Sequence, residues 1–294
     1  MVKYRKGVSG EYMVDRKNLK HYFLKKILFR VDYAGLLDSD VEKIVSQLRR
    51  VFYDAGFINF QEEYNNQLNI QFNIDMSSQS VNASQNDLDK LHIYHFYNEK
   101  NENILLSKKY LILDMEINTA GYSFDHYVNV LGETISCLND VSEYSKPIRI
   151  GIQKTNVMYL SDLSMINNYF SKLVFNSEEL TNLYKDYTCF NFNSHLDFRK
   201  DSMILTCHRN IQEGQMSDEK GEIFKSYQII LDYLVYNENT NDIINLLKDK
   251  CSNEEYIKEL NDIEFELYKK SLTSEFIEKL KQENFTDYKI GGVI

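Results

Sequence analysis

Alternation of apolar and polar residues, the pattern of a strand that buries one face, recurs along this chain. It is clearest over residues 27–33, where Ile27, Phe29 and Val31 share one face, and over residues 68–74. Less regular alternation predicts further strands over residues 92–97, 104–108, 110–118, 148–159, 187–198, 203–209 and 227–235. We expect a loop at 212–221 between the last two of these strands, because that segment is polar and contains two glycines.

Helical periodicity separates these strands at a few places. Ser39 and Glu42 have the spacing of a capping box, apolar residues follow three or four apart, and Gly56 ends the pattern. The pattern therefore predicts a helix over residues 39–56. The same reasoning predicts helices over residues 123–138, 163–170, 242–247 and 253–282.

The order of these elements indicates the fold class. Strand, helix, several strands and helix occur within residues 19–142, and strands followed by helices recur within residues 147–282. This order favours an α+β protein with mainly antiparallel twisted sheet, packed helices and a helical C-terminal part. It also suggests two similar halves, residues 1–145 and 146–294. No linker rich in proline or serine separates them, so a single domain is the alternative.

Composition narrows the class of protein. The 294 residues are 43% hydrophobic, which is enough for a core, and the formal net charge of -10 opposes tight binding to nucleic acid. No apolar run has the length of a membrane span, and the first residues lack the apolar centre of a signal peptide, so we expect a cytoplasmic protein without membrane contact. The four cysteines show no CxxC spacing, and we expect neither a bound metal nor a cofactor.

Two carboxylates stand out within the predicted strand at 110–118. Asp114 and Glu116 are two residues apart, so both side chains project from the same face of the strand. Such a pair could bind a divalent metal, although hard cations require more oxygen ligands than two side chains provide. The simpler interpretation is an ordinary polar face of a sheet.

The predicted strand at 148–159 raises a question, because Gly151 lies between two long polar side chains. Arg149, Gly151 and Gln153 share one face of this strand. If this strand lies beside the one at 110–118, Arg149 pairs with Asp114 or Glu116, and the glycine leaves a notch into which another segment or a ligand presses. The alternative is a groove for an anion or a partner, with Arg149 at its floor.

Histidines are few, and their spacing argues against joint chemistry. His92 and His95 are three residues apart in a predicted strand and therefore lie on opposite faces. His195, Asp197 and Arg199 share one face of another strand, which could hold an acid–base pair or form an exposed polar edge. We favour the polar edge.

The chain finishes with the sequence NFTDYKIGGVI, which is unusually apolar for an end. Its apolar residues can dock on the protein's own core, or they can add to another subunit as a strand or plug. The residues expected to dock are Tyr288, Ile290, Val293 and Ile294.

The stretch Arg149-Ile150-Gly151-Ile152, followed by Asn156, resembles the RIG[LIV]xxxN signature of a family of uncharacterised bacterial proteins that are sporadically distributed across genomes. The segments IILDYLVY at 229–236 and IEFELYKKSLT at 263–273 resemble further landmarks of that family. The resemblance implies patchy inheritance of the kind seen for phage-defence and mobile-element genes. It implies no known reaction. Four residues of this strand are candidates for binding a ligand or partner: Arg149, Gly151, Gln153 and Asn156.

Taken together, these features predict a non-catalytic binding protein that acts as an accessory, sensor or regulatory component of a bacterial phage-defence or mobile-element system. A protein partner or a homo-oligomer is expected. The first alternative is a metal-dependent nuclease or phosphodiesterase that uses Asp114 and Glu116. The second is a binder of a nucleotide or small anion, with Arg149 as the anchor.

Overall fold

The computed structural model describes residues 16–66, 90–117, 124–181, 189–217, 223–285 and 290–291. The strands are β1 (Leu24–Ala34), β2 (Asn59–Asn66), β3 (Lys90–Tyr97), β4 (Glu102–Leu106), β5 (Tyr110–Glu116), β6 (Lys146–Leu160), β7 (Asn191–Lys200), β8 (Met203–Ser217), β9 (Ile223–Asn237) and β10 (Ile290–Gly291). The helices are α1 (Asp38–Asp54), α2 (Asp125–Asp140), α3 (Ile166–Tyr169), α4 (Ser177–Thr181), α5 (Thr240–Leu246), α6 (Lys250–Ser271) and α7 (Ser274–Leu280), with 3-10 turns η1 (Arg16–Asn18) and η2 (Leu163–Met165).

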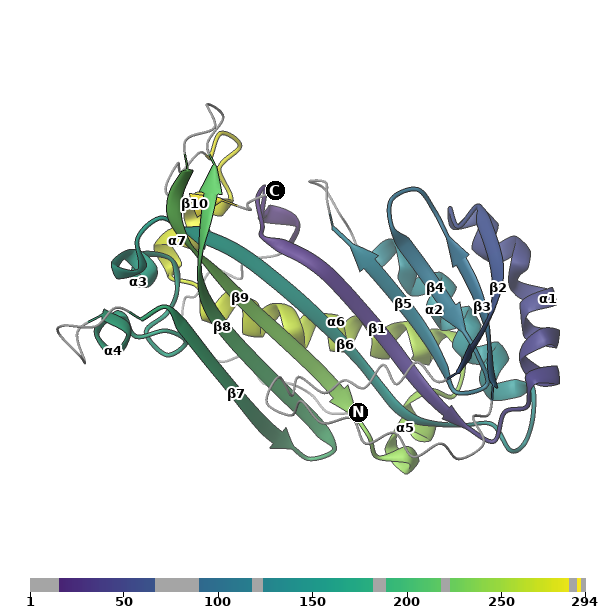
Figure 1. Cartoon of the computed structure of the whole chain (residues 1–294). Helices are drawn as coiled ribbons and strands as arrows, with labels where there is room; N and C mark the ends of the chain where they lie inside the picture. Colours follow the sequence, from purple (N-terminus) through teal and green to yellow (C-terminus); the bar gives the residue numbers. More distant parts are fainter. Residues whose placement is uncertain are drawn as a thin grey trace.

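The strands form a twisted antiparallel sheet in the order β2-β3-β4-β5-β1-β6-β9-β8-β7, and β10 adds to β6 (Figure 1). The expected α+β class with mainly antiparallel sheet and C-terminal helices is confirmed. In each half the first strand lies at the centre of the sheet, so the order outward is β1-β5-β4-β3-β2 on one side and β6-β9-β8-β7 on the other. The two halves meet where β1 pairs with β6, so the strands on both sides of residue 145 belong to one continuous sheet.

Helices α1, α2, α5 and α6 pack on one face of this sheet, with α6 running along it (Figure 1). Alternate residues of β1, namely Ile27, Phe29 and Val31, are fully buried on that face. They belong to a large apolar cluster that includes α1, α2 and the first half of α6. A second cluster lies under β8 and β9 and includes Phe265 and Tyr268 from the second half of α6. The long helix therefore joins the cores of the two halves.

A buried ion pair fastens α6 to the centre of the sheet. Lys154 of β6 projects toward the helix, and its Nζ lies 2.5 Å from Oε2 of Glu264. Their side chains are only 6% and 2% exposed. Burial lowers the pKa of Lys154, against the opposing effect of the Glu264 carboxylate. Removing either partner would leave the other as an isolated buried charge, which is strongly unfavourable.

Several predicted details differ from the structure. The cap of α1 lies two residues earlier than Ser39, because the backbone N–H of Leu37 donates to the Asp40 carboxylate at 3.0 Å. The expected loop at 212–221 is in part the paired ends of β8 and β9. The polar strand β2, which is an outer strand among the described ones, was not predicted because it has few apolar residues. The strand predicted at 68–74 lies outside the described residues.

The strand at 110–118 does not lie beside the one at 148–159, so the condition for pairing Arg149 with Asp114 or Glu116 is not met. These strands are β5 and β6, and β1 lies between them, paired with both. Both run antiparallel to β1, so they are parallel to each other, as a helical crossover through α2 requires. The connection from β5 through α2 to β6 therefore skips one strand position in the sheet, and β1 occupies that position.

Candidate functional site

The sheet face opposite the helices carries a line of polar residues that passes from strand to strand. Each of its members is the register partner of the next, so the side chains stand side by side on one face. We call this line the polar row and this face the polar face. The polar row consists, from β5 to β7, of Glu116, Lys26, Thr155, Asp232, His208 and His195.

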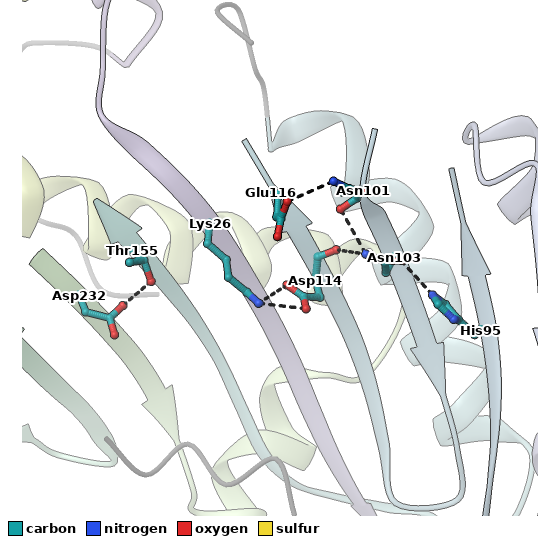
Figure 2. A network of polar contacts seen from close by, with 8 residues as sticks. All are labelled: Lys26, His95, Asn101, Asn103, Asp114, Glu116, Thr155 and Asp232. Carbon is teal, nitrogen blue, oxygen red and sulfur yellow. Dashed lines mark hydrogen bonds and ion pairs between the residues drawn. The ribbon is translucent and has the colours of Figure 1, made fainter. Parts of the chain in front are cut away.

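Asp232 lies near the middle of the polar row and is only 8% exposed. Both of its carboxylate oxygens accept hydrogen bonds from β6, since Thr155 Oγ1 and Gln153 Nε2 each donate at 2.8 Å. Figure 2 shows Thr155 directed at this carboxylate, with Lys26 on the neighbouring strand β1. Burial raises the pKa of Asp232, although these two hydrogen bonds and the charge of Lys26 act in the opposite direction.

His208 lies next to Asp232 in the register of β8 and β9 and is 7% exposed. Its Nε2 lies 2.8 Å from the Asn193 side-chain oxygen, which requires the Nε2 atom to carry the proton. Burial, with help from the nearby His195, lowers the pKa of His208. The two neighbouring groups Asp232 and His208 are thus both shifted toward their uncharged forms. Perturbed ionisable groups that gather in one place are typical of functional sites.

A second set of contacts extends the polar face toward β3 (Figure 2). Lys26 Nζ lies 2.9 Å from Oδ1 of Asp114. The side-chain amide of Asn103 donates to the backbone oxygens of Asn101 and Asp114, so its own oxygen must face His95. His95 Nε2 then donates to that oxygen at 2.9 Å, and its Nδ1 lies 3.1 Å from the Glu63 carboxylate. Both ring nitrogens of His95 are therefore held in place.

The four residues expected to bind a ligand or partner all lie in β6, but they do not share a face. Arg149, Gly151 and Gln153 are on the polar face, whereas the buried Asn156 is on the helix face with Lys154. Only Gln153 joins the hydrogen bonds around Asp232. The structure therefore brings Gln153 to the candidate site and directs Asn156 away from it.

The question raised by Gly151 has an answer in the neighbouring strand. Gly151 is the register partner of Tyr236 in β9, and a Cβ atom at this position would lie 2.6 Å from the Tyr236 Cβ and 2.8 Å from the Val235 backbone oxygen. The notch that was expected here is thus occupied by this chain's own tyrosine. The Tyr236 ring extends to Arg149, whose guanidinium carbon lies 4.2 Å from the ring centroid.

The expected pairing of Arg149 with Asp114 or Glu116 is wrong, because β1 separates their strands. Asp114 contacts Lys26 of β1, and Glu116 accepts a hydrogen bond from the Asn101 side chain at 3.1 Å. The two carboxylates share a face, as predicted, but each has its own partner. Among the residues that the structure describes, no group of three or more His, Cys, Asp or Glu side chains is placed to hold a metal ion.

The C-terminal stretch is described only at β10. Ile290 and Gly291 pair with Leu160 and Tyr159 of β6, on the side of that strand where β1 has already ended. This pairing is with the protein's own sheet. Three other residues expected to dock lie outside the described part of the chain: Tyr288, Val293 and Ile294.

Sequence reasoning missed most of the polar row. The signal for Asp232 was present in the sequence, because it is the one charged residue within the apolar strand IILDYLVY. A lone carboxylate in such a strand needs hydrogen-bond donors from its neighbours. The partners could not be identified, since Thr155, Lys26 and His208 come from three other strands, whose order the sequence does not give.

Comparison with known proteins identifies no relative: no protein-family model, no curated protein and no solved structure matches this chain. Within the described residues, no helix has both the length and the apolar character needed to cross a membrane.

Proposed function

We propose that this protein is a non-catalytic binding protein that recognises a protein partner through the polar face of its sheet. The observation that carries the proposal is the polar row, which lines up hydrogen-bonding side chains from six neighbouring strands. Near its centre, burial raises the pKa of Asp232 and lowers the pKa of His208. A rigid surface of this kind selects its partner by the positions of donors and acceptors more than by net charge.

We further propose that the protein acts in the cytoplasm as an accessory, sensor or regulatory component of a bacterial phage-defence or mobile-element system. The support for this role is the resemblance of the β6 stretch, from Arg149 to Asn156, to the signature of a sporadically distributed bacterial family. A component that recognises another protein needs a stable, preformed surface, and the central strands of a large sheet provide one.

The two alternative functions have less support. A metal-dependent nuclease or phosphodiesterase would use Asp114 and Glu116, but Asp114 is paired with Lys26 and Glu116 with Asn101. A binder of nucleotides or small anions would use Arg149, whose guanidinium lies over its own Tyr236 ring. Either function would require these side chains to leave their present contacts.

The proposal is tested by comparing two lysine variants in bacteria that carry this gene with its neighbouring genes. Lys26→Ala removes a cation of the polar row whose side chain is 46% exposed. Lys258→Ala removes the same charge from an exposed position on α6 and serves as the matched control. We expect Lys26→Ala to lower protection against phage, measured by plating efficiency, while Lys258→Ala protects like the wild type. Both variants should melt at the wild-type temperature, because partly exposed ion pairs contribute little stability.

Equal protection by both variants would contradict recognition through the polar face. If the wild-type genes give no protection, the defence role is wrong, and the binding surface is then tested separately. A photo-crosslinking amino acid in place of Gln153 should capture a specific protein in cells, whereas the same group in place of Lys258 should not. Identical crosslinking patterns at the two positions would refute the surface as well.

A further inference from the structure

β7 is an outer strand of the sheet, and one of its edges has no neighbour among the described strands. It pairs with β8 on the other side. Every residue from 195 to 200 is exposed, including Leu196 at 41% and Phe198 at 52%. A long outer strand with exposed apolar side chains is a template for pairing with another strand, unless the protein protects it.

The apolar face of the sheet also continues to this edge. One line of register partners runs from Ile152 through Val235 and Leu205 to Phe198. The first two are fully buried beneath the helices, and the third is partly buried. Phe198 thus extends a row of the core beyond the part of the sheet that the helices cover, and a neighbouring strand would give it an apolar partner.

The opposite face of β7 carries charges that can match a second copy of the same strand. Asp197 and Arg199 are two residues apart on the polar face, with side chains 57% and 66% exposed. Two antiparallel copies related by a two-fold axis through Phe198 place each Asp197 opposite Arg199 of the other copy. The same axis places the two Phe198 rings opposite each other on the helix side. An axis through Asp197 would instead place like charges together.

We propose that two copies of this chain associate through antiparallel pairing of β7 with β7, about a two-fold axis at Phe198, to form one continuous sheet. The contacts that these side chains already make are compatible with this arrangement. Asp197 accepts from Thr206 of β8 at 2.6 Å and from His195 at 3.1 Å, and Arg199 reaches Glu238 at 3.2 Å. The overlapping segment, residues 196–200, is short, so the dimer should be weak and dependent on concentration.

Charge reversal tests the pairing, with sedimentation velocity of the full chain over a range of concentrations as the measurement. We expect the wild type to pass from monomer to dimer as its concentration rises. Asp197→Arg and Arg199→Asp should each weaken dimerisation about 10-fold or more, because each places like charges opposite each other in two symmetric positions. The double variant Asp197→Arg/Arg199→Asp should recover dimerisation, since it restores both pairs with reversed sign. Lys258→Ala on α6 should behave like the wild type.

A cysteine crosslink tests the position of the axis independently of charge. In a Cys189→Ser/Cys251→Ser background, Phe198→Cys should form a disulfide-linked dimer on oxidation, because a residue on the axis faces its own copy within disulfide range. Leu196→Cys should crosslink far less. A wild type that is monomeric at all concentrations, a double variant that stays monomeric, or preferential crosslinking through Leu196→Cys would each overturn the proposal. Melting curves confirm that every variant is folded.

Discussion

Replacing Gly151 by alanine should destabilise the protein sharply, because this position has no room for a side chain. Opposed Cβ atoms in an antiparallel pair are normally about 4.5 to 5.5 Å apart. Here an added Cβ would lie 2.6 Å from the Tyr236 Cβ and 2.8 Å from the Val235 oxygen. Neither neighbour is the end of a flexible side chain, so β6 and β9 would have to separate at the centre of the sheet. We expect a loss of about 1 to 3 kcal/mol in the free energy of unfolding.

The matched control is Gly214→Ala in β8. This glycine also lies in a strand of the sheet, but a Cβ there would meet no atom within 4 Å. We expect Gly214→Ala to be neutral or to stabilise by up to about 1 kcal/mol, because alanine loses less conformational freedom on folding than glycine. Urea unfolding followed by circular dichroism measures both variants. If Gly151→Ala is as stable as the wild type, the close contact between β6 and β9 is not the reason for the glycine, and a role in binding would become the better explanation.

Two further predictions concern buried charges. Lys154→Met should lower the free energy of unfolding by about 3 to 5 kcal/mol, whereas Lys154→Met/Glu264→Leu should recover most of that loss in urea unfolding, because no buried charge is then left unpaired. A double variant as unstable as the single one would contradict this account. The pKa of Asp232 is higher in the folded than in the unfolded protein, so the folded protein binds more protons at this residue. The contribution of Asp232 to the free energy of unfolding is therefore present at low pH and is lost as the pH rises through the folded-state pKa. As the pH rises above about 4, the ordinary aspartate pKa, the wild type should therefore lose more stability than Asp232→Asn, and parallel pH curves for the two proteins would refute the raised pKa.

The local pattern of apolar and polar residues was sufficient to predict most strands and helices of the fold. The alternation over residues 27–33 correctly predicted β1, and the helical periodicity after residue 39 correctly predicted α1. Burial of one face gives apolar residues a period of 2 in strands and of 3.6 in helices. β2 was not predicted, because a strand with few apolar residues lacks that alternation. The strand containing His195 was expected to form an exposed polar edge, and most residues of that strand, β7, are exposed.

The sequence by itself determined which residues face the same side of each strand, and so placed Arg149, Gly151 and Gln153 together on β6. It also placed Asp114 and Glu116 together on β5. Only the tertiary structure decided which strands are neighbours. Because β1 lies between β5 and β6, Arg149 contacts Tyr236 of β9 and not a carboxylate of β5. The polar row likewise consists of residues from strands that are far apart in the chain. The physical reason is that side-chain direction follows from local backbone geometry, whereas strand order follows from how all the apolar faces are buried at once.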